Sequence, residues 1–338
     1  MIRFLAVVAL AALGLASTAQ AQTFPTKPIR LVVPFAPGGG TDNLMRIIVP
    51  EVSASLGQQI NIDNKPGGGS VGGTDLVAKA LPDGYTILAS DSAFVTNPGL
   101  MKNLPYQTLR DFTGITMMAK APVILVVHPS VPAKTIGELV ALAKAKPGTL
   151  NYASGGNGSS THLAGELFKQ VAGIDIVHVP YKGSGPAMND LIAGQVQMSF
   201  SGISSARQYI EGGQLRVLAL TGDKRNPALP NVPTFDESGL RGIDAETYWG
   251  LYAPAATPPD VVKILNQNFT KALRSPQLAQ RLADLGYETM ANTPEAHTAQ
   301  MKQMIATWTA ILATTRRASR RPSVARRGAE GCFRVIRS

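Results

Sequence analysis

The sequence predicts an α/β protein made of two similar halves, and three observations support this fold class. Apolar runs typical of buried strands alternate with helix-like runs, glycine- and serine-rich loops separate them, and the pattern begins again near residue 123. A chain of 338 residues is long enough for about two domains. Because helical crossovers join parallel strands, we expect mostly parallel sheets.

In the first half, two glycine-rich loops each lie between an expected strand and an expected helix. Their sequences are 34-PFAPGGGTD-42 and 65-KPGGGS-70. Thr41 or Asp42 can cap the first helix, whose apolar residues recur with helical spacing. The expected strands of this half are 29–35, 59–63 and 85–90.

The second half repeats this alternation of strands, polar loops and helices. Thr135 and Glu138 form a capping box at the start of its first helix. A further strand at 248–253 precedes three helices that each begin with proline. The expected strands of this half are 123–128, 149–153, 176–179, 195–200 and 215–220.

The N-terminus has the features of a cleavable secretory signal. Arg3 supplies a positive charge, residues 4–15 are apolar, and an A-x-A cleavage site ends at Ala21. The apolar stretch is shorter than the roughly 20 residues that span a bilayer. We therefore expect a signal peptide at 1–21 and a soluble, periplasmic mature chain.

The formal charge of +10 belongs mostly to the C-terminal end. Residues 316–338 contain eight arginines and one glutamate, a balance of +7. We interpret 311–338 as an aberrant or disordered arginine-rich tail, and the alternative is a basic arm that binds anionic lipid or nucleic acid. The single cysteine, Cys332, lies in this tail, so no internal disulfide is possible.

The glycine-rich loops are candidates for an anion site, because backbone N–H groups at helix N-termini attract negative charge. Asp42 repels an anion, so it either caps the helix, fixes the loop, or accepts a hydrogen bond from an amine or hydroxyl of a ligand. The alternative for both loops is an ordinary turn between strand and helix. The candidates from these loops are Gly39, Gly40, Thr41, Asp42, Gly69 and Ser70.

Matching loops of the second half supply candidates for the opposite side. Ser159 or Ser160 can also be plain helix caps, His162 can be a structural histidine, and Lys182 can be a solvated lysine rather than a cation for the ligand. Asp91, which follows the third strand, is a further candidate. The second-half candidates are Ser154, Ser159, Ser160, Thr161, His162, Tyr181 and Lys182.

Several strings resemble one family in the right order, from Thr23 to Trp308. They include PFAPGGGTD, NKPGGGSVGG, NYASGGNGSSTHLAGELF and VPYKGSGPAMNDLIAGQV. They are similar to the Bug-type solute-binding receptors of tripartite tricarboxylate transporters. The resemblance implies a type II periplasmic-binding-protein fold with two Rossmann-like lobes around a central cleft.

The resemblance also implies how the chain is divided and what it does. Lobe one would be 22–124 plus 243–310, and lobe two would be 125–242. The ligand would be a small carboxylate: a di- or tricarboxylate, an acidic amino acid or an aromatic acid. A monomer would deliver it to the membrane subunits of a transporter, without a cofactor, a metal, a catalytic residue or nucleic acid.

Other classes of function have weaker support in the sequence. An exported α/β enzyme acting on a small carboxylic acid is the main alternative, but no G-x-S-x-G motif is present and the four histidines form no recognised motif. Gly67, Gly69 and Gly72 match G-x-G-x-x-G, yet an exported protein has little access to nicotinamide cofactors. A DNA-binding regulator would need a helix-turn-helix, which the sequence lacks.

Overall fold

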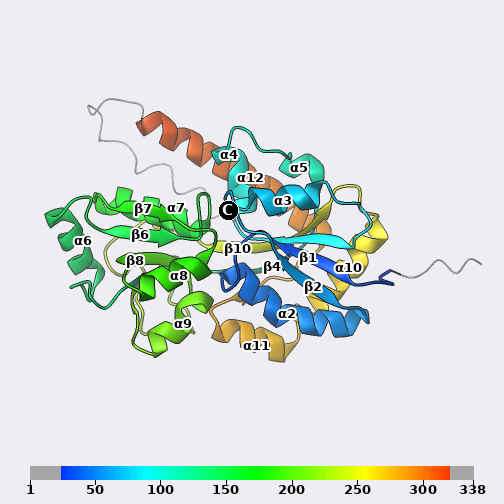
Figure 1. The fold of residues 1–338 in the computed structure, drawn as a ribbon, viewed down its shortest axis with the longest axis horizontal. Helices are drawn as coiled ribbons and strands as arrows, with labels where there is room; N and C mark the ends of the chain where they lie inside the picture. The colour runs from blue at the N-terminus through cyan, green and yellow to red at the C-terminus, as the bar shows by residue number, and fades with distance from the viewer. Residues whose placement is uncertain (1–23, 320–338) are drawn as a thin grey trace, which may run out of the picture.

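A computed structural model describes residues 24–319, which form two α/β lobes lying side by side (Figure 1). The first lobe contains a six-stranded sheet in the order β11-β4-β10-β3-β1-β2. Its strands are β1 (Ile29–Val33), β2 (Ile60–Asn64), β3 (Thr86–Ser90), β4 (Phe112–Ala121), β10 (Thr247–Pro254) and β11 (Glu288–Thr289). Its helices are α2 (Gly40–Leu56), α3 (Val71–Ala78), α4 (Ala93–Leu100), α5 (Thr108–Asp111), α10 (Pro259–Leu273), α11 (Pro276–Asp284) and α12 (Pro294–Ser319).

The second lobe contains a five-stranded sheet in the order β7-β6-β8-β5-β9. Its strands are β5 (Val123–Val127), β6 (Asn151–Ser154), β7 (Val177–Pro180), β8 (Met198–Gly202) and β9 (Arg216–Leu220). Its helices are α6 (Ile136–Ala145), α7 (Ser160–Ala172), α8 (Ser184–Ile192) and α9 (Ile203–Glu211). Each lobe therefore has a sheet with helices around it, as the alternating pattern predicts.

The two sheets share one arrangement, with a reversed strand beside three parallel ones. In the first sheet β2, β1 and β3 are parallel and β10 runs antiparallel to β3. In the second sheet β7, β6 and β8 are parallel and β5 runs antiparallel to β8. The expectation of mostly parallel sheets is thus wrong for the pairing of the strands, which is mixed. β5 and β10 run antiparallel to their neighbours because each of them arrives from the other lobe.

The chain crosses between the lobes twice. β4 of the first sheet ends at Ala121 and β5 of the second begins at Val123, so the first crossing lies at Pro122. Before the return crossing, Ile243 and Ala245 still pack in the core of the second lobe, and Thr247 already pairs in the first sheet. Both crossings lie close to the predicted lobe bounds, which stay a prediction.

The helices after β10 return to the first lobe. α10 packs against α2 and β4, and α12 packs against α4 and β4. Among residues 24–319, none of the helices has both the length and the apolar character that crossing a bilayer requires. The predicted signal peptide and all of the tail beyond Ser319 lie outside the described residues, whereas α12 extends into the first residues of that tail.

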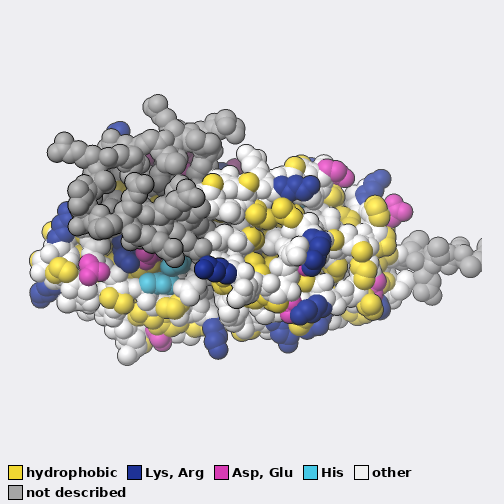
Figure 2. All heavy atoms as spheres, turned by 90° about the horizontal axis from the view of Figure 1, so that it is seen from above, with side chains coloured by type: hydrophobic (Ala, Val, Ile, Leu, Met, Phe, Trp, Pro, Cys, Tyr) yellow, Lys and Arg dark blue, Asp and Glu magenta, His cyan; other side chains and the backbone are white. Residues whose placement is uncertain are grey.

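Basic side chains are not concentrated on the described face in Figure 2. Lys and Arg are scattered over it and Asp and Glu lie among them. Several basic side chains of the described residues pair with acids, as in Lys79–Asp75 and Arg207–Glu211. The described body therefore lacks, on this face, the continuous basic patch that nucleic-acid binding requires.

Candidate ligand site between the lobes

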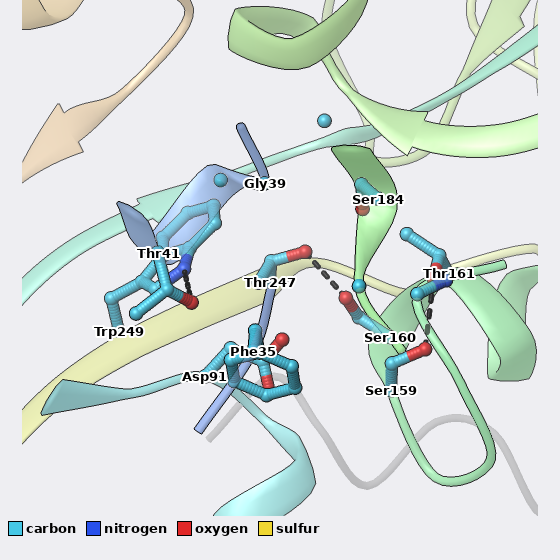
Figure 3. Close-up of a pocket in the computed structure, with 14 residues that line it drawn as sticks. Phe35, Gly39, Thr41, Asp91, Ser159, Ser160, Thr161, Ser184, Thr247 and Trp249 are labelled. Carbon is cyan, nitrogen blue, oxygen red and sulfur yellow. Dashed lines mark hydrogen bonds between the residues drawn. The ribbon is translucent and has the colours of Figure 1, made fainter. Parts of the chain in front are cut away.

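A narrow cavity lies between the two lobes, and both lobes contribute to its wall (Figure 3). Its volume is about 30 Å³, which is room for about two water molecules. Apart from the acid Asp91, the lining side chains are small, hydroxylated or aromatic. The residues are Phe35, Gly39, Gly40, Thr41, Asp91, Gly155, Ser159, Ser160, Thr161, Gly183, Ser184, Gly202, Thr247 and Trp249.

On the first-lobe side, the N-terminus of α2 packs against Trp249 of β10. Trp249 Nε1 donates a hydrogen bond of 3.0 Å to Thr41 Oγ1. A Cβ at Gly40 would come within 2.9 Å of Trp249 Cζ2, so only glycine allows this approach. The N-cap is Gly39, without a side-chain cap. The expectation that Thr41 or Asp42 caps this helix is wrong, because the Thr41 hydroxyl is engaged by Trp249.

Asp42 lies behind the first glycine loop and outside the cavity lining. Its carboxylate is 2% exposed and accepts hydrogen bonds from three donors. These are Gly38 N at 3.0 Å, Arg46 Nε at 2.8 Å and Asn64 Nδ2 at 3.1 Å. Of the roles considered for Asp42, the contacts agree with fixing the loop.

On the second-lobe side, a hydroxyl cluster begins α7. Ser159 is the N-cap, because its Oγ accepts a hydrogen bond from His162 N. Thr161 Oγ1 accepts from Gly155 N at 2.9 Å and lies 2.8 Å from Ser159 Oγ. Ser160 Oγ lies 2.5 Å from Thr247 Oγ1 of β10 (Figure 3), so this contact joins α7 to the crossing strand.

Four helices direct their N-termini at the cavity. They are α2 at Gly40, α7 at Ser160, α8 at Ser184 and α9, whose N-cap is Gly202. The first N–H groups of a helix have no partner within the helix, and the helix dipole adds a partial positive charge there. The cavity wall thus favours an anion although it contains no lysine, arginine or histidine.

The second glycine loop lies beside the cavity and not in its wall. Asn97 Nδ2 donates hydrogen bonds to Gly69 O at 2.8 Å and to Ser70 Oγ at 3.3 Å. A Cβ at Gly69 would come within 2.8 Å of Asn157 O of the second lobe. Gly69 therefore lies at a contact between the lobes and Ser70 is held within the first lobe, and neither lines the cavity.

Ser154 and His162 also lie outside the lining, and both contact His178. Ser154 Oγ lies 2.7 Å from His178 Nε2, and the His178 ring stacks on His162 at 4.4 Å between ring centres. Burial lowers the pKa of His178 to about 4, and also lowers that of His162. Among the described residues, no cluster of three or more acidic, histidine or cysteine side chains could hold a metal.

The loop 180–185 contributes Gly183 and Ser184 to the cavity wall, whereas Tyr181 and Lys182 lie outside it. Tyr181 Oη donates a hydrogen bond of 2.6 Å to Asp190 Oδ2. The side chain of Lys182 is exposed and outside the lining. The structure therefore gives Lys182 no contact with the cavity, and its carbonyl instead accepts a hydrogen bond of 2.9 Å from Ala36 N across the cleft.

Asp91 is the one ionisable side chain in the cavity wall. It directly follows β3, and its Oδ1 accepts a hydrogen bond of 2.8 Å from Ala93 N. Burial between the lobes raises its pKa to about 7. Seven of the predicted residues thus meet at the cavity: Gly39, Gly40, Thr41, Asp91, Ser159, Ser160 and Thr161.

The sequence reasoning missed seven lining residues. Four of them, Phe35, Gly155, Gly183 and Ser184, belong to loops that the sequence marks as candidates. Gly202 ends β8 immediately before a helix, which is the same strand-to-helix signal as at Gly39. Thr247 and Trp249 carry no such signal, since only the pairing of β10 beside β3 and β4 brings its residues here.

Fold and site together define a two-lobed ligand receptor of the periplasmic-binding-protein type. The family model of the tripartite tricarboxylate transporter family receptor matches residues 44–316. The chain belongs to this receptor family.

Named relatives agree with this assignment. Protein BugT of Bordetella pertussis is 35% identical over 319 residues, covering 93% of this chain and 98% of BugT. A solved structure of R. palustris Rpa4515 with adipate is 34% identical, with a TM-score of 0.83, and the match covers 86% of this chain and 98% of that one. MatC from Rhodopseudomonas palustris with bound malate is 31% identical, with a TM-score of 0.79, covering 86% of this chain and 100% of MatC.

Proposed function

We propose that this chain is an exported receptor that binds a small carboxylate between its lobes and delivers it to the membrane subunits of a tripartite transporter. The observation that carries the proposal is the convergence of four helix N-termini from both lobes on one cavity. Each favourable contact between an anion and a helix N-terminus contributes about 0.3–1 kcal/mol, and more when it is partly buried. A carboxylate is a small anion whose two oxygens can accept from several of these N–H groups at once.

Capture and release would require the lobes to separate. The cavity of about 30 Å³ is too small either to admit or to contain a dicarboxylate, so the lobes would separate to take one up and would close less fully around it. Direct hydrogen bonds join the lobes around the cavity. One is Thr96 Oγ1 to Gly158 O at 2.6 Å, and another is Ala36 N to Lys182 O. A hinge at the two crossings, near Pro122 and between Ala245 and Thr247, would open the cleft, and the ligand would shift the population toward the closed form.

Adipate and malate in the two related structures support a carboxylate as the ligand of this chain. Both are dicarboxylates. In this chain, the first- and second-lobe sides of the cavity each contain helix N-termini, so a ligand with two carboxylates would have an anchor in each lobe. That arrangement would couple binding to closure, because only the closed form offers both anchors.

The enzyme alternative gains no support from the site. Ser154 and His178 are close enough for a nucleophile and base, but Ser154 is fully buried and lies outside the cavity lining. The lowered pKa of His178, about 4, makes it a weak base at neutral pH. A receptor that binds without chemistry needs neither group.

A thermal-shift screen of carboxylates against the mature chain tests the proposal. A ligand at 1,000 times its dissociation constant stabilises the folded protein by about 4 kcal/mol. The informative variant is Gly202→Leu, because a Cβ there meets only Ser204 Oγ, at 4.0 Å. The matched control is Gly72→Leu in α3, where a Cβ meets nothing within 4 Å and which is outside the cavity.

We expect malate, adipate or another small carboxylate to raise the melting temperature of the wild type and of Gly72→Leu. Gly202→Leu should fold with a similar melting temperature and show no shift, because the added side chain occupies the cavity. Stabilisation by a nucleotide or peptide, with none by any carboxylate, would refute the proposal. Turnover of a bound carboxylate would favour the enzyme alternative instead.

A further inference from the structure

The cavity contains an acid where the proposed ligand is itself an acid. Asp91 is the only ionisable side chain among the fourteen lining residues, and no cation in the wall neutralises it. Among the described residues, the hydrogen bond made by its carboxylate is the one that Oδ1 accepts from Ala93 N. An ionised Asp91 and a bound carboxylate would therefore repel each other across the cavity.

When two carboxylates share one desolvated site, a proton bound to one of them removes the repulsion. A protonated carboxyl group is also a hydrogen-bond donor, and a carboxylate oxygen is its best acceptor. The pKa of Asp91, raised to about 7 by burial, means that this proton is available near neutral pH. Ligand binding would raise that pKa further.

Resting on the proposed function, we propose that Asp91 binds the ligand as a neutral carboxylic acid, so that capture of each carboxylate takes up one proton. Asp91 is then a specificity-determining residue: it donates a hydrogen bond to an oxygen of the acid, and it rejects ligands that offer only hydrogen-bond donors at that position. Backbone N–H groups at the helix N-termini stabilise the negative charge of the ligand, and Asp91 donates a hydrogen bond to an acceptor oxygen of the ligand.

Among the described residues, the titratable side chains that neighbour Asp91 do not change charge in the same range. Burial together with the charge of Asp91 raises the pKa of Tyr252 of β10 well above its usual value. His297 of α12 packs against Tyr252, with ring centres 4.9 Å apart. Burial lowers the pKa of His297 to about 3. Both groups are thus neutral from pH 6 to pH 9, and only Asp91 changes charge.

Isothermal titration of the mature chain with malate and with adipate tests the inference. The affinity of the wild type should fall about fivefold from pH 7 to pH 8, where Asp91 is still partly protonated, and about tenfold from pH 8 to pH 9, because one proton is then taken up. Titrations at pH 8 in buffers with different ionisation enthalpies should count close to one proton per ligand. Asp91→Asn keeps an acceptor for Ala93 N and a donor for the ligand, so it should bind with pH-independent affinity and take up no proton.

The control is Asp260→Asn, which removes an exposed carboxylate at the start of α10 and should behave as the wild type. Wild-type affinity that is constant from pH 6 to pH 9 would overturn the inference alone and leave the proposed function standing. The inference would also be overturned if the wild type bound only ligands that carry an ammonium group and Asp91→Asn bound none of them, because that result would show an ionised Asp91. Failure of every carboxylate to bind at pH 6 would overturn the proposed function and this inference together.

Discussion

Replacing Asp42 with alanine is expected to destabilise the first lobe by about 3 to 6 kcal/mol, the sum for two hydrogen bonds to a charged group, although Asp42 does not line the cavity. Two of its hydrogen bonds, from Gly38 N and Asn64 Nδ2, are made by a carboxylate that is 2% exposed. A hydrogen bond to a charged group contributes about 1.5–3 kcal/mol. The third donor, Arg46, has a side chain 54% exposed, so its pairing adds less than about 1 kcal/mol.

Urea denaturation followed by tryptophan fluorescence measures this change in the right lobe. The protein has two tryptophans, Trp249 in β10 and Trp308 in α12, and both elements pack in the first lobe. The matched control is Asp63→Ala, whose carboxylate pairs with the partly exposed Arg30 and Lys65 and should contribute under about 1 kcal/mol. An Asp42→Ala loss no larger than that of the control would refute the role of Asp42 in fixing the loop.

Two further changes test the contact between the lobes and the buried acid. A Cβ at Gly185 would overlap the carbonyl oxygen of Pro37 across the cleft, so Gly185→Ala should hold the lobes apart. Small-angle scattering should show a larger radius of gyration for this variant, and titration with a carboxylate should show a weaker affinity. An unchanged radius of gyration would contradict this prediction. For the unliganded protein, the raised pKa of Asp91 means that its contribution to stability is present below about pH 4 and is lost as the pH rises through about 7. Asp91→Asn should therefore be more stable than the wild type at pH 8, by up to about 4 kcal/mol, and about as stable as the wild type at pH 4. Denaturant titrations at the two pH values measure this difference. An equal difference in stability at both pH values would contradict a raised pKa of Asp91.

The sequence predicted most strands and helices because their patterns are periodic and their ends carry caps, glycine or proline. It missed β4, which is buried along almost its whole length and so shows no alternation of polar and apolar residues. Its sequence, FTGITMMAKA, also mixes glycine, alanine and lysine with few β-branched residues. It missed α4 as well, a helix that contains Pro98.

The direction of the strands is the second feature of the fold that could not be predicted from the sequence. Val123–Val127 reads as a buried strand from its composition, but nothing in those residues says that it pairs antiparallel to β8. Direction follows from where the chain comes from, and β5 enters its sheet directly from β4 of the other lobe. Crossings of this kind are visible only once the two sheets are assembled.

The residues of the candidate site likewise fall into those that the sequence predicts and those that it does not. Residues at strand-to-helix turns were found because glycine and hydroxyl side chains mark such turns, as at Gly39 and Ser160. Within one loop, however, the sequence could not separate Ser184, which lines the cavity, from Lys182, which is exposed. Thr247 and Trp249 were missed as lining residues because their position depends on β10 crossing from the other lobe.

The shared strand order of the two sheets explains why the cavity is built from backbone rather than from cations. Parallel strands of both sheets end at the cleft, so α2 of the first lobe and α7, α8 and α9 of the second present their N-termini to the same space. This framework holds a carboxylate whatever side chains surround it, because N–H groups are common to all residues. Discrimination between one acid and another is then left to the few side chains that add chemistry or shape to the wall: Asp91, Thr247 and Trp249. Substitutions at these three positions should change which acid is bound, whereas substitutions that disturb the helix N-termini should weaken the binding of every acid.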